Sequence, residues 1–149
     1  MVKLPDESTF GILLFNYMQE KKLTYTLEEA KRSLERYCAY QDRCHQEIDR
    51  KLKEMRMIPE ACEVIFLHLM EHDFLNEERF ARSFARGKFR IKQWGRQRIE
   101  RELKQRDISA YNIKAGLSEI SQEEYEKTFM EVSRKRFLSV HETDLYRKR

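Results

Sequence analysis

The chain has 149 residues with a net charge of +4, and 38% of them are charged, but it contains only four glycines and two prolines. Helix breakers are therefore scarce, whereas Lys, Arg, Glu, Gln and Leu lose little rotamer freedom in a helix, so the composition favours an all-α fold. No apolar run approaches the roughly 18 residues that a membrane-spanning helix needs, and we expect no membrane partner.

Residues 1–25 form a separate N-terminal segment. Their apolar side chains recur at the spacing of an amphipathic helix, namely Phe10, Leu13, Leu14, Tyr17 and Met18. We expect this helix to cap the units that follow. A peptide that docks onto a partner protein is the alternative.

Residues 26–74 predict a first unit of three helices. Thr26 stands as the N-cap of the first helix, and Glu29 follows three residues later as in a capping box. The second helix runs from about residue 44 to 55, and Pro59 suits the first turn of the third helix. The predicted inward residues are Ala30, Leu34, Tyr37 and Cys38, then Ile48, Leu52 and Met55, then Cys62, Ile65, Phe66, Leu69 and Met70.

Residues 75–120 repeat this pattern after a shift of 51 residues. The identical pairs are Ala30 and Ala81, Gln46 and Gln97, Ile48 and Ile99, Arg50 and Arg101, Leu52 and Leu103, and Lys53 and Lys104. Amphipathic helices share some residues by chance, but here the order of helices matches as well. Helices are predicted over residues 76–92, 95–106 and 109–117, with Asn76 and Ser109 as caps. Repeats of this length are typical of stacked helical units.

Residues 121–149 predict the start of a third unit. Ser121 and Glu124 have capping-box spacing, and Tyr125, Phe129, Val132 and Phe137 are expected to face inward. The pattern stops at Arg149, so we expect this unit to be incomplete.

The second unit concentrates positive charge. Residues 79–106 contain eleven Lys or Arg and two Glu, which gives a local charge of +9 in a chain whose total is +4. Such polarisation causes self-repulsion in the free protein, which an anionic partner relieves. A solvated cationic face without a partner is the alternative.

These cations are expected on two surfaces that merge at Trp94-Gly95. Arg82, Arg86, Arg90 and Lys92 are predicted to point away from the Phe80 and Phe84 stripe, and Arg96, Arg98, Arg101 and Lys104 away from Ile99 and Leu103. Trp94 is either a wedge between helices or a stacking surface for a base or a protein. The candidate binding residues are Arg82, Arg86, Lys88, Arg90, Lys92, Trp94, Arg96, Arg98, Arg101 and Lys104.

One stretch looks catalytic. His68 to His72 spells H-x-x-E-H, a pattern in which two histidines bind zinc beside a glutamate base. Its third-ligand position is undefined, and histidines at a helix end are the other interpretation. We predict no catalytic residue, no metal site and no cofactor.

Three cysteines, Cys38, Cys44 and Cys62, form an odd set without C-x-x-C spacing. Neither a disulfide framework nor a zinc knuckle is indicated, and buried thiols are expected. A reducing cytoplasm suits such a chain best.

A composite motif lies in the second unit: Leu75, then Asn76-Glu77-Glu78, Arg79-Phe80-Ala81, Trp94-Gly95 and Ile99-Glu100-Arg101-Glu102-Leu103. It resembles the RecX family, bacterial regulators of the RecA recombinase. Weaker similarity continues over most of the chain from residue 30 to about 137. Two features depart from the family: residues 40–44 replace its usual Arg and Ser, and the Arg-Gly-aromatic segment of a third unit is missing.

The resemblance implies three tandem three-helix units in a curved, elongated protein. It also implies an inhibitor that binds along the RecA filament on DNA and blocks strand exchange and ATP hydrolysis, in homologous recombination, DNA repair and the SOS response. We expect a monomer. Two alternatives remain open, an autonomous DNA-binding protein and a scaffold that holds another protein on its concave side.

Overall fold

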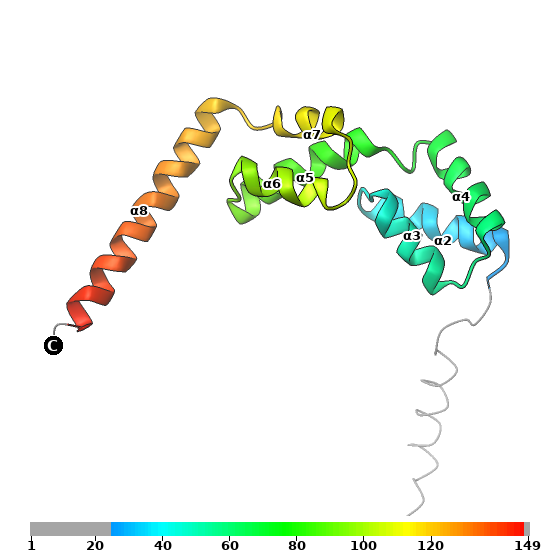
Figure 1. Cartoon of the computed structure of the whole chain (residues 1–149), viewed down its shortest axis with the longest axis horizontal. Coiled ribbons are helices and arrows are strands. Elements are labelled where there is room, and N and C mark those ends of the chain that lie inside the picture. Colours follow the sequence, from blue (N-terminus) through cyan, green and yellow to red (C-terminus); the bar gives the residue numbers. More distant parts are fainter. Residues whose placement is uncertain (1–24, 148–149) are drawn as a thin grey trace, which may run out of the picture.

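The computed structural model describes residues 25–147, with side chains up to residue 140. Every regular element in this range is a helix, and the molecule is an elongated arch (Figure 1). The predicted all-α fold is confirmed, whereas the helix expected within residues 1–25 lies almost entirely outside the described residues. The helices are α2 (Leu27–Tyr40), α3 (His45–Glu54), α4 (Pro59–Glu71), α5 (Glu77–Lys92), α6 (Arg96–Lys104), α7 (Ala110–Leu117) and α8 (Gln122–Arg147).

Side-chain caps begin the helices where the sequence predicts them. Glu29 N donates to Thr26 Oγ1 (3.3 Å) and Thr26 N donates to Glu29 Oε2 (3.0 Å), which completes the predicted capping box of α2. Asn76 and Ser109 accept backbone N–H bonds at the starts of α5 and α7. Each cap satisfies a donor that the helix itself leaves unpaired, so these starts are encoded locally.

Two hydrophobic clusters lie along the chain. Helices α2, α3 and α4 surround the first cluster, and α5, α6 and α7 surround the second. Repeat partners occupy matching places, since Ile48 and Ile99, like Leu52 and Leu103, are 0% exposed. The tandem three-helix arrangement is therefore confirmed, while the division at residues 26–74 and 75–120 stays a proposal. Met70 was predicted to face inward, which is wrong, because 44% of its surface is exposed.

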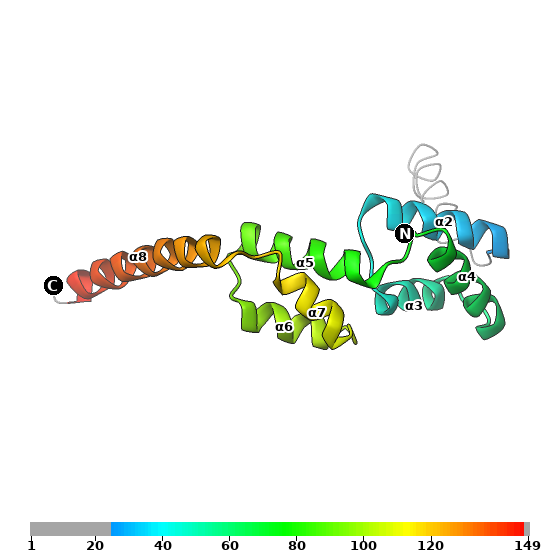
Figure 2. The same cartoon turned by 90° about the horizontal axis from the view of Figure 1, so that it is seen from above.

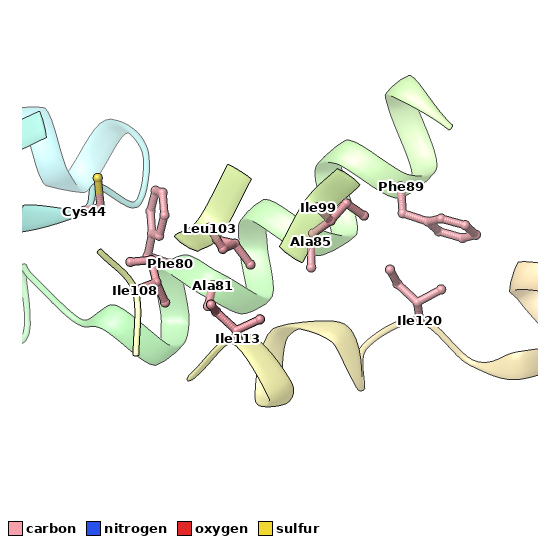
Figure 3. Packing of buried hydrophobic residues seen from close by; sticks show 10 residues of the cluster. All are labelled: Cys44, Phe80, Ala81, Ala85, Phe89, Ile99, Leu103, Ile108, Ile113 and Ile120. Atoms are coloured by element: carbon pink, nitrogen blue, oxygen red, sulfur yellow. The ribbon is translucent and has the colours of Figure 1, made fainter. Parts of the chain in front are cut away.

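The turn between α2 and α3 inserts into the second unit. Cys44 is 1% exposed and belongs to the second cluster, next to α5 in Figure 3. In the same turn, Asp42 accepts hydrogen bonds from Arg79 Nε (2.8 Å) and from Ser83 Oγ. The two units therefore share a buried thiol and an ion pair at their junction.

Helix α8 starts on the second unit and then projects away from it (Figures 1 and 2). Its first turn packs through Tyr125, whose ring centroid is 6.1 Å from that of Phe89. The prediction that Phe129, Val132 and Phe137 face inward is wrong, because they are 60%, 38% and 64% exposed. An inward face requires neighbouring helices, and within the described residues α8 meets the second unit only through its first turns.

Helices α5 and α7 approach closely because residue 116 is glycine. A Cβ atom at Gly116 would lie 2.7 Å from the carbonyl oxygen of Ala81, closer than real Cβ contacts allow. Gly87 of α5 differs, because a Cβ atom there would meet nothing within 4 Å.

Alanine substitution is expected to change the free energy of unfolding in opposite directions at the two glycines. Gly116→Ala is expected to lower the free energy of unfolding by about 1–3 kcal/mol, because the methyl group forces the helices apart. Gly87→Ala is expected to raise it by about 0.5–1 kcal/mol, because alanine loses less entropy in a helix. Urea denaturation of both variants measures the difference. A similar gain in both would contradict close α5–α7 packing.

Candidate functional site

The predicted cations fall into two groups, and carboxylates from elsewhere in the chain neutralise the first. Arg82 Nη1 lies 2.6 Å from Glu119 Oε1, and Arg86 Nη1 lies 3.0 Å from Glu119 Oε2. Arg90 Nε lies 2.9 Å from Glu124 Oε1 of α8. These three arginines point away from the Phe80 and Phe84 stripe, as predicted, but they bind acids of this chain rather than face solvent unpaired.

Glu119 has an unusual environment for a half-buried surface carboxylate. Hydrogen bonds from Arg82 and then Arg86 lower its pKa from the usual 4.5, because both favour the charged form. The pKa of Arg82 is raised by its hydrogen bonds to Glu78 and Glu119. This side of α5 is thus an ion-pair network that attaches the segment between α7 and α8.

The second group surrounds the turn between α5 and α6. Gln93 ends α5 in the left-handed conformation (φ 53°), and Trp94 N donates to Lys88 O (3.2 Å). The Trp94 ring then lies against two cations, with Lys88 Nζ 5.0 Å and Arg98 Cζ 3.9 Å from its centroid. The electron-rich ring face attracts both cations. Helices α5 and α6 therefore do bring their cations together at this turn.

Lys92 lies on a different face from the one predicted. It lines an open groove of about 490 Å³ together with Phe80, Phe84 and Lys88. Lys92 lies about 80° further round α5 than Phe84, with Lys88 between them, so it forms the rim of the groove beside the stripe. The prediction that Lys92 points away from the Phe80 and Phe84 stripe is wrong.

Two predicted residues of α6 have partners of their own. Arg96 donates to Ile120 O (2.9 Å) and to Gln122 Oε1 (2.9 Å), so it connects α6 to the start of α8. Lys104 Nζ lies 2.6 Å from Glu100 Oε1. Arg101 is exposed.

Five of the predicted cations have no carboxylate partner within residues 25–140, and one of them, Arg96, is held by Gln122 and the Ile120 carbonyl instead. We name the other four and Trp94 the Trp94 surface, whose members are Lys88, Lys92, Trp94, Arg98 and Arg101. Lys88 and Arg98 contact the ring, while Lys92 and Arg101 are exposed on the same two helices. The sequence pointed to these residues, but it did not separate them from the arginines that hold α8. That separation depends on Glu119 and Glu124, which lie outside the basic stretch.

The H-x-x-E-H stretch forms contacts that need no metal. His68 Nε2 lies 2.6 Å from Glu35 Oε1 of α2, and His72 Nδ1 lies 2.9 Å from His68 O. Among the described residues, no three His, Cys, Asp or Glu side chains are arranged to hold a metal ion. Cys38 and Cys44 are buried as predicted, whereas Cys62 is only partly buried. Burial raises the pKa of the Cys38 thiol to about 11.

The helices of the described part of the chain include none that combines the length and the apolarity needed to cross a bilayer.

Comparison with known proteins finds a match over the second unit. Residues 76–117 match the family described as "RecX, second three-helix domain". The resemblance to the RecX family is confirmed. A regulatory protein RecX of Lactobacillus gasseri is 32% identical over 89 residues, which are 60% of this chain and 33% of that protein. One of Enterococcus faecalis is 34% identical over 82 residues, 55% of this chain and 31% of that protein. The matched part thus spans about a third of the length of these curated RecX relatives.

Solved RecX structures share the fold. A crystal structure of regulatory protein RecX has a TM-score of 0.70 at 21% identity, covering 94% of this chain and 66% of that one. RecX from Lactobacillus salivarius has a TM-score of 0.65 at 18% identity, with 73% and 71% covered. The likeness supports the arrangement of helices described above.

The ion pairs of Glu119 predict a pH-dependent stability. Glu119→Gln is expected to lower the free energy of unfolding at pH 7, because the amide keeps an acceptor but loses the charge. The folded-state pKa is lowered from 4.5, so the contribution is complete above that value and is lost as the pH falls through the lowered pKa. The native and variant proteins should therefore converge in acid.

Urea denaturation at pH 7 and at about pH 3 measures this difference, with Glu131→Gln of the exposed part of α8 as the control. A deficit of the Glu119 variant that stays constant with pH would rule out the charge as its cause.

Proposed function

We propose that this protein is an inhibitor of the RecA recombinase that binds along the RecA filament on DNA and reduces ATP hydrolysis and strand exchange. Similarity to proteins named regulatory protein RecX supports this assignment. The same activity is implied by the composite motif of the second unit. We propose the Trp94 surface as the contact region.

The observation that carries the proposal is that Lys88 and Arg98 meet at the turn between α5 and α6 without carboxylate partners in the described structure, and that the exposed Lys92 and Arg101 of the same two helices also lack such partners. A filament on DNA presents acidic protein groups and phosphates, and cations that meet phosphates release condensed counterions. The arginines that bind Glu119 and Glu124 are less suited to this role, because a partner would first have to displace those carboxylates.

Trp94 also lowers the cost of binding. Lys88 and Arg98 rest against its ring, so part of their rotamer freedom is already lost before a partner arrives. Flexible cations lose that freedom at the moment of association, which reduces affinity. The Trp94 surface is thus partly preorganised for an anionic target.

Inhibition of RecA tests the proposal. Adding the protein to RecA on single-stranded DNA is expected to lower ATP hydrolysis and strand exchange. A variant with Lys88, Lys92, Arg98 and Arg101 changed to Ala should need at least about tenfold more protein for the same inhibition, the loss expected from removing about 1.4 kcal/mol of binding free energy.

The matched control removes four exposed cations elsewhere, with Arg32, Arg36, Lys114 and Lys127 changed to Ala. It should inhibit like the native protein. Tight DNA binding without an effect on RecA would favour an autonomous DNA-binding protein. Indifference to both RecA and DNA would favour a scaffold.

The salt dependence of binding gives an independent prediction. If the four cations of the Trp94 surface each neutralise one phosphate, affinity for the filament should fall roughly 100-fold between about 50 and 200 mM salt. Fluorescence anisotropy of a labelled filament measures this slope. For the variant without the four cations, affinity should depend only weakly on salt. If the affinity of the native protein does not change with salt concentration, the contact is not electrostatic.

A further inference from the structure

The internal repeat includes exposed residues as well as core residues. Helices α3 and α6 are the second helices of the two units, and their buried pairs, Ile48 with Ile99 and Leu52 with Leu103, are explained by packing. Three other identical pairs are exposed: Gln46 and Gln97, Arg50 and Arg101, and Lys53 and Lys104. Substitutions at exposed positions change stability little, so stability alone does not explain these identities.

The electrostatic roles of these residues also repeat. Lys53 Nζ lies 2.6 Å from Asp49 Oδ2, and Lys104 Nζ lies 2.6 Å from Glu100 Oε1, so each lysine pairs with the acid one turn before it. Arg50 and Arg101 follow these acids directly in sequence, yet neither forms an ion pair with any residue in the described range. Each unit therefore presents one unpaired guanidinium at the same place in its second helix.

The two helices lie on the same side of the molecule. In both Figure 1 and Figure 2, α3 and α6 lie along the same side of the long axis. Gln46 in the first turn of α3 donates to Gln105 O at the end of α6 (3.2 Å) and to the carboxylate of Asp107. The start of α3 thus adjoins the end of α6, and Arg50 lies at this junction, where it lines a pocket with Glu102 and Gln105.

We infer that Arg50 and Arg101 make equivalent contacts with one phosphodiester backbone, so that the DNA-binding surface spans both units. This inference rests on the proposed function and deepens it. A guanidinium binds a phosphate through two parallel N–H···O bonds. A polymer with charges at regular intervals matches two identical cations that the fold presents one repeat apart, whereas an acidic protein surface has no such regularity.

Anisotropy with RecA-free DNA tests the inference, using fluorescein-labelled 30-nucleotide single strands and 30-base-pair duplexes as separate probes. Arg50→Ala and Arg101→Ala should each weaken binding about threefold to tenfold and reduce the slope of log affinity against log salt by about 1. The double variant should lose the product of the two factors. The preferred probe identifies the form of DNA that is bound.

Two further variants sharpen the test. Arg50→Lys keeps the charge but loses the bidentate geometry, and it should restore the salt slope with only part of the affinity. The control, Arg32→Ala with Arg36→Ala, removes two exposed cations from α2 and should bind DNA like the native protein. Circular dichroism establishes that each variant keeps its helices.

The outcomes separate the inference from the proposed function. If Arg101→Ala weakens DNA binding and Arg50→Ala does not, the inference fails while the Trp94 surface stands. If both variants bind bare DNA normally but lose the RecA filament, the contact is with protein and the inference is overturned. If both variants bind DNA equally weakly and the native protein does not inhibit RecA, the shared DNA contact stands and the proposed RecA function fails.

Discussion

The relation between the two units depends on the turn that joins α2 to α3. Cys44 fills the end of the second core, and the neighbouring Asp42 carboxylate binds Arg79 and Ser83 of α5. A rotation of one unit against the other would expose the thiol and leave a carboxylate and a guanidinium without partners. Both changes are unfavourable, so the junction resists bending. The alignment of α3 with α6, and with it any surface shared by the two units, follows from this turn.

The ion-pair partners of the basic residues were the feature that the sequence predicted least well. The count of +9 over residues 79–106 is correct, but the acids that face this segment stand outside it, at positions such as Asp42, Glu119 and Glu124. A carboxylate 33 to 37 residues away in the chain reaches an arginine only through the fold. Sequence spacing therefore located the basic region, and tertiary structure decided which of its cations remain available.

Local patterns predicted the helices well because their causes are local. A capping side chain such as Thr26 or Asn76 bonds a backbone N–H three residues away, so sequence spacing is sufficient evidence. Burial was harder to predict. Leu69 and Met70 are adjacent on α4 and point about 100° apart, so only one of them reaches the centre of the core.

Burial was also hard to predict for helix α8. Its large apolar residues lie on several sides of the helix, so the pattern defines no single inward face. Phe129 and Phe137, for example, are separated by eight residues, more than two turns, while Met130 and Leu138 lie elsewhere on the surface. Whether such residues are buried depends on how many helices surround them, which spacing within one helix does not specify.

The two groups of cations illustrate two ways of holding like charges close together. A carboxylate such as Glu119 relieves repulsion between Arg82 and Arg86, but it also cancels the charge that a phosphate would meet. An aromatic ring attracts a cation through its quadrupole and carries no net charge. Trp94 thus holds Lys88 and Arg98 in place and leaves their full charge for a partner. Lys88 and Arg98, which rest on this ring and have no carboxylate partner in the described structure, are therefore suited to an anionic target, whereas Arg82 and Arg86 stabilise the fold.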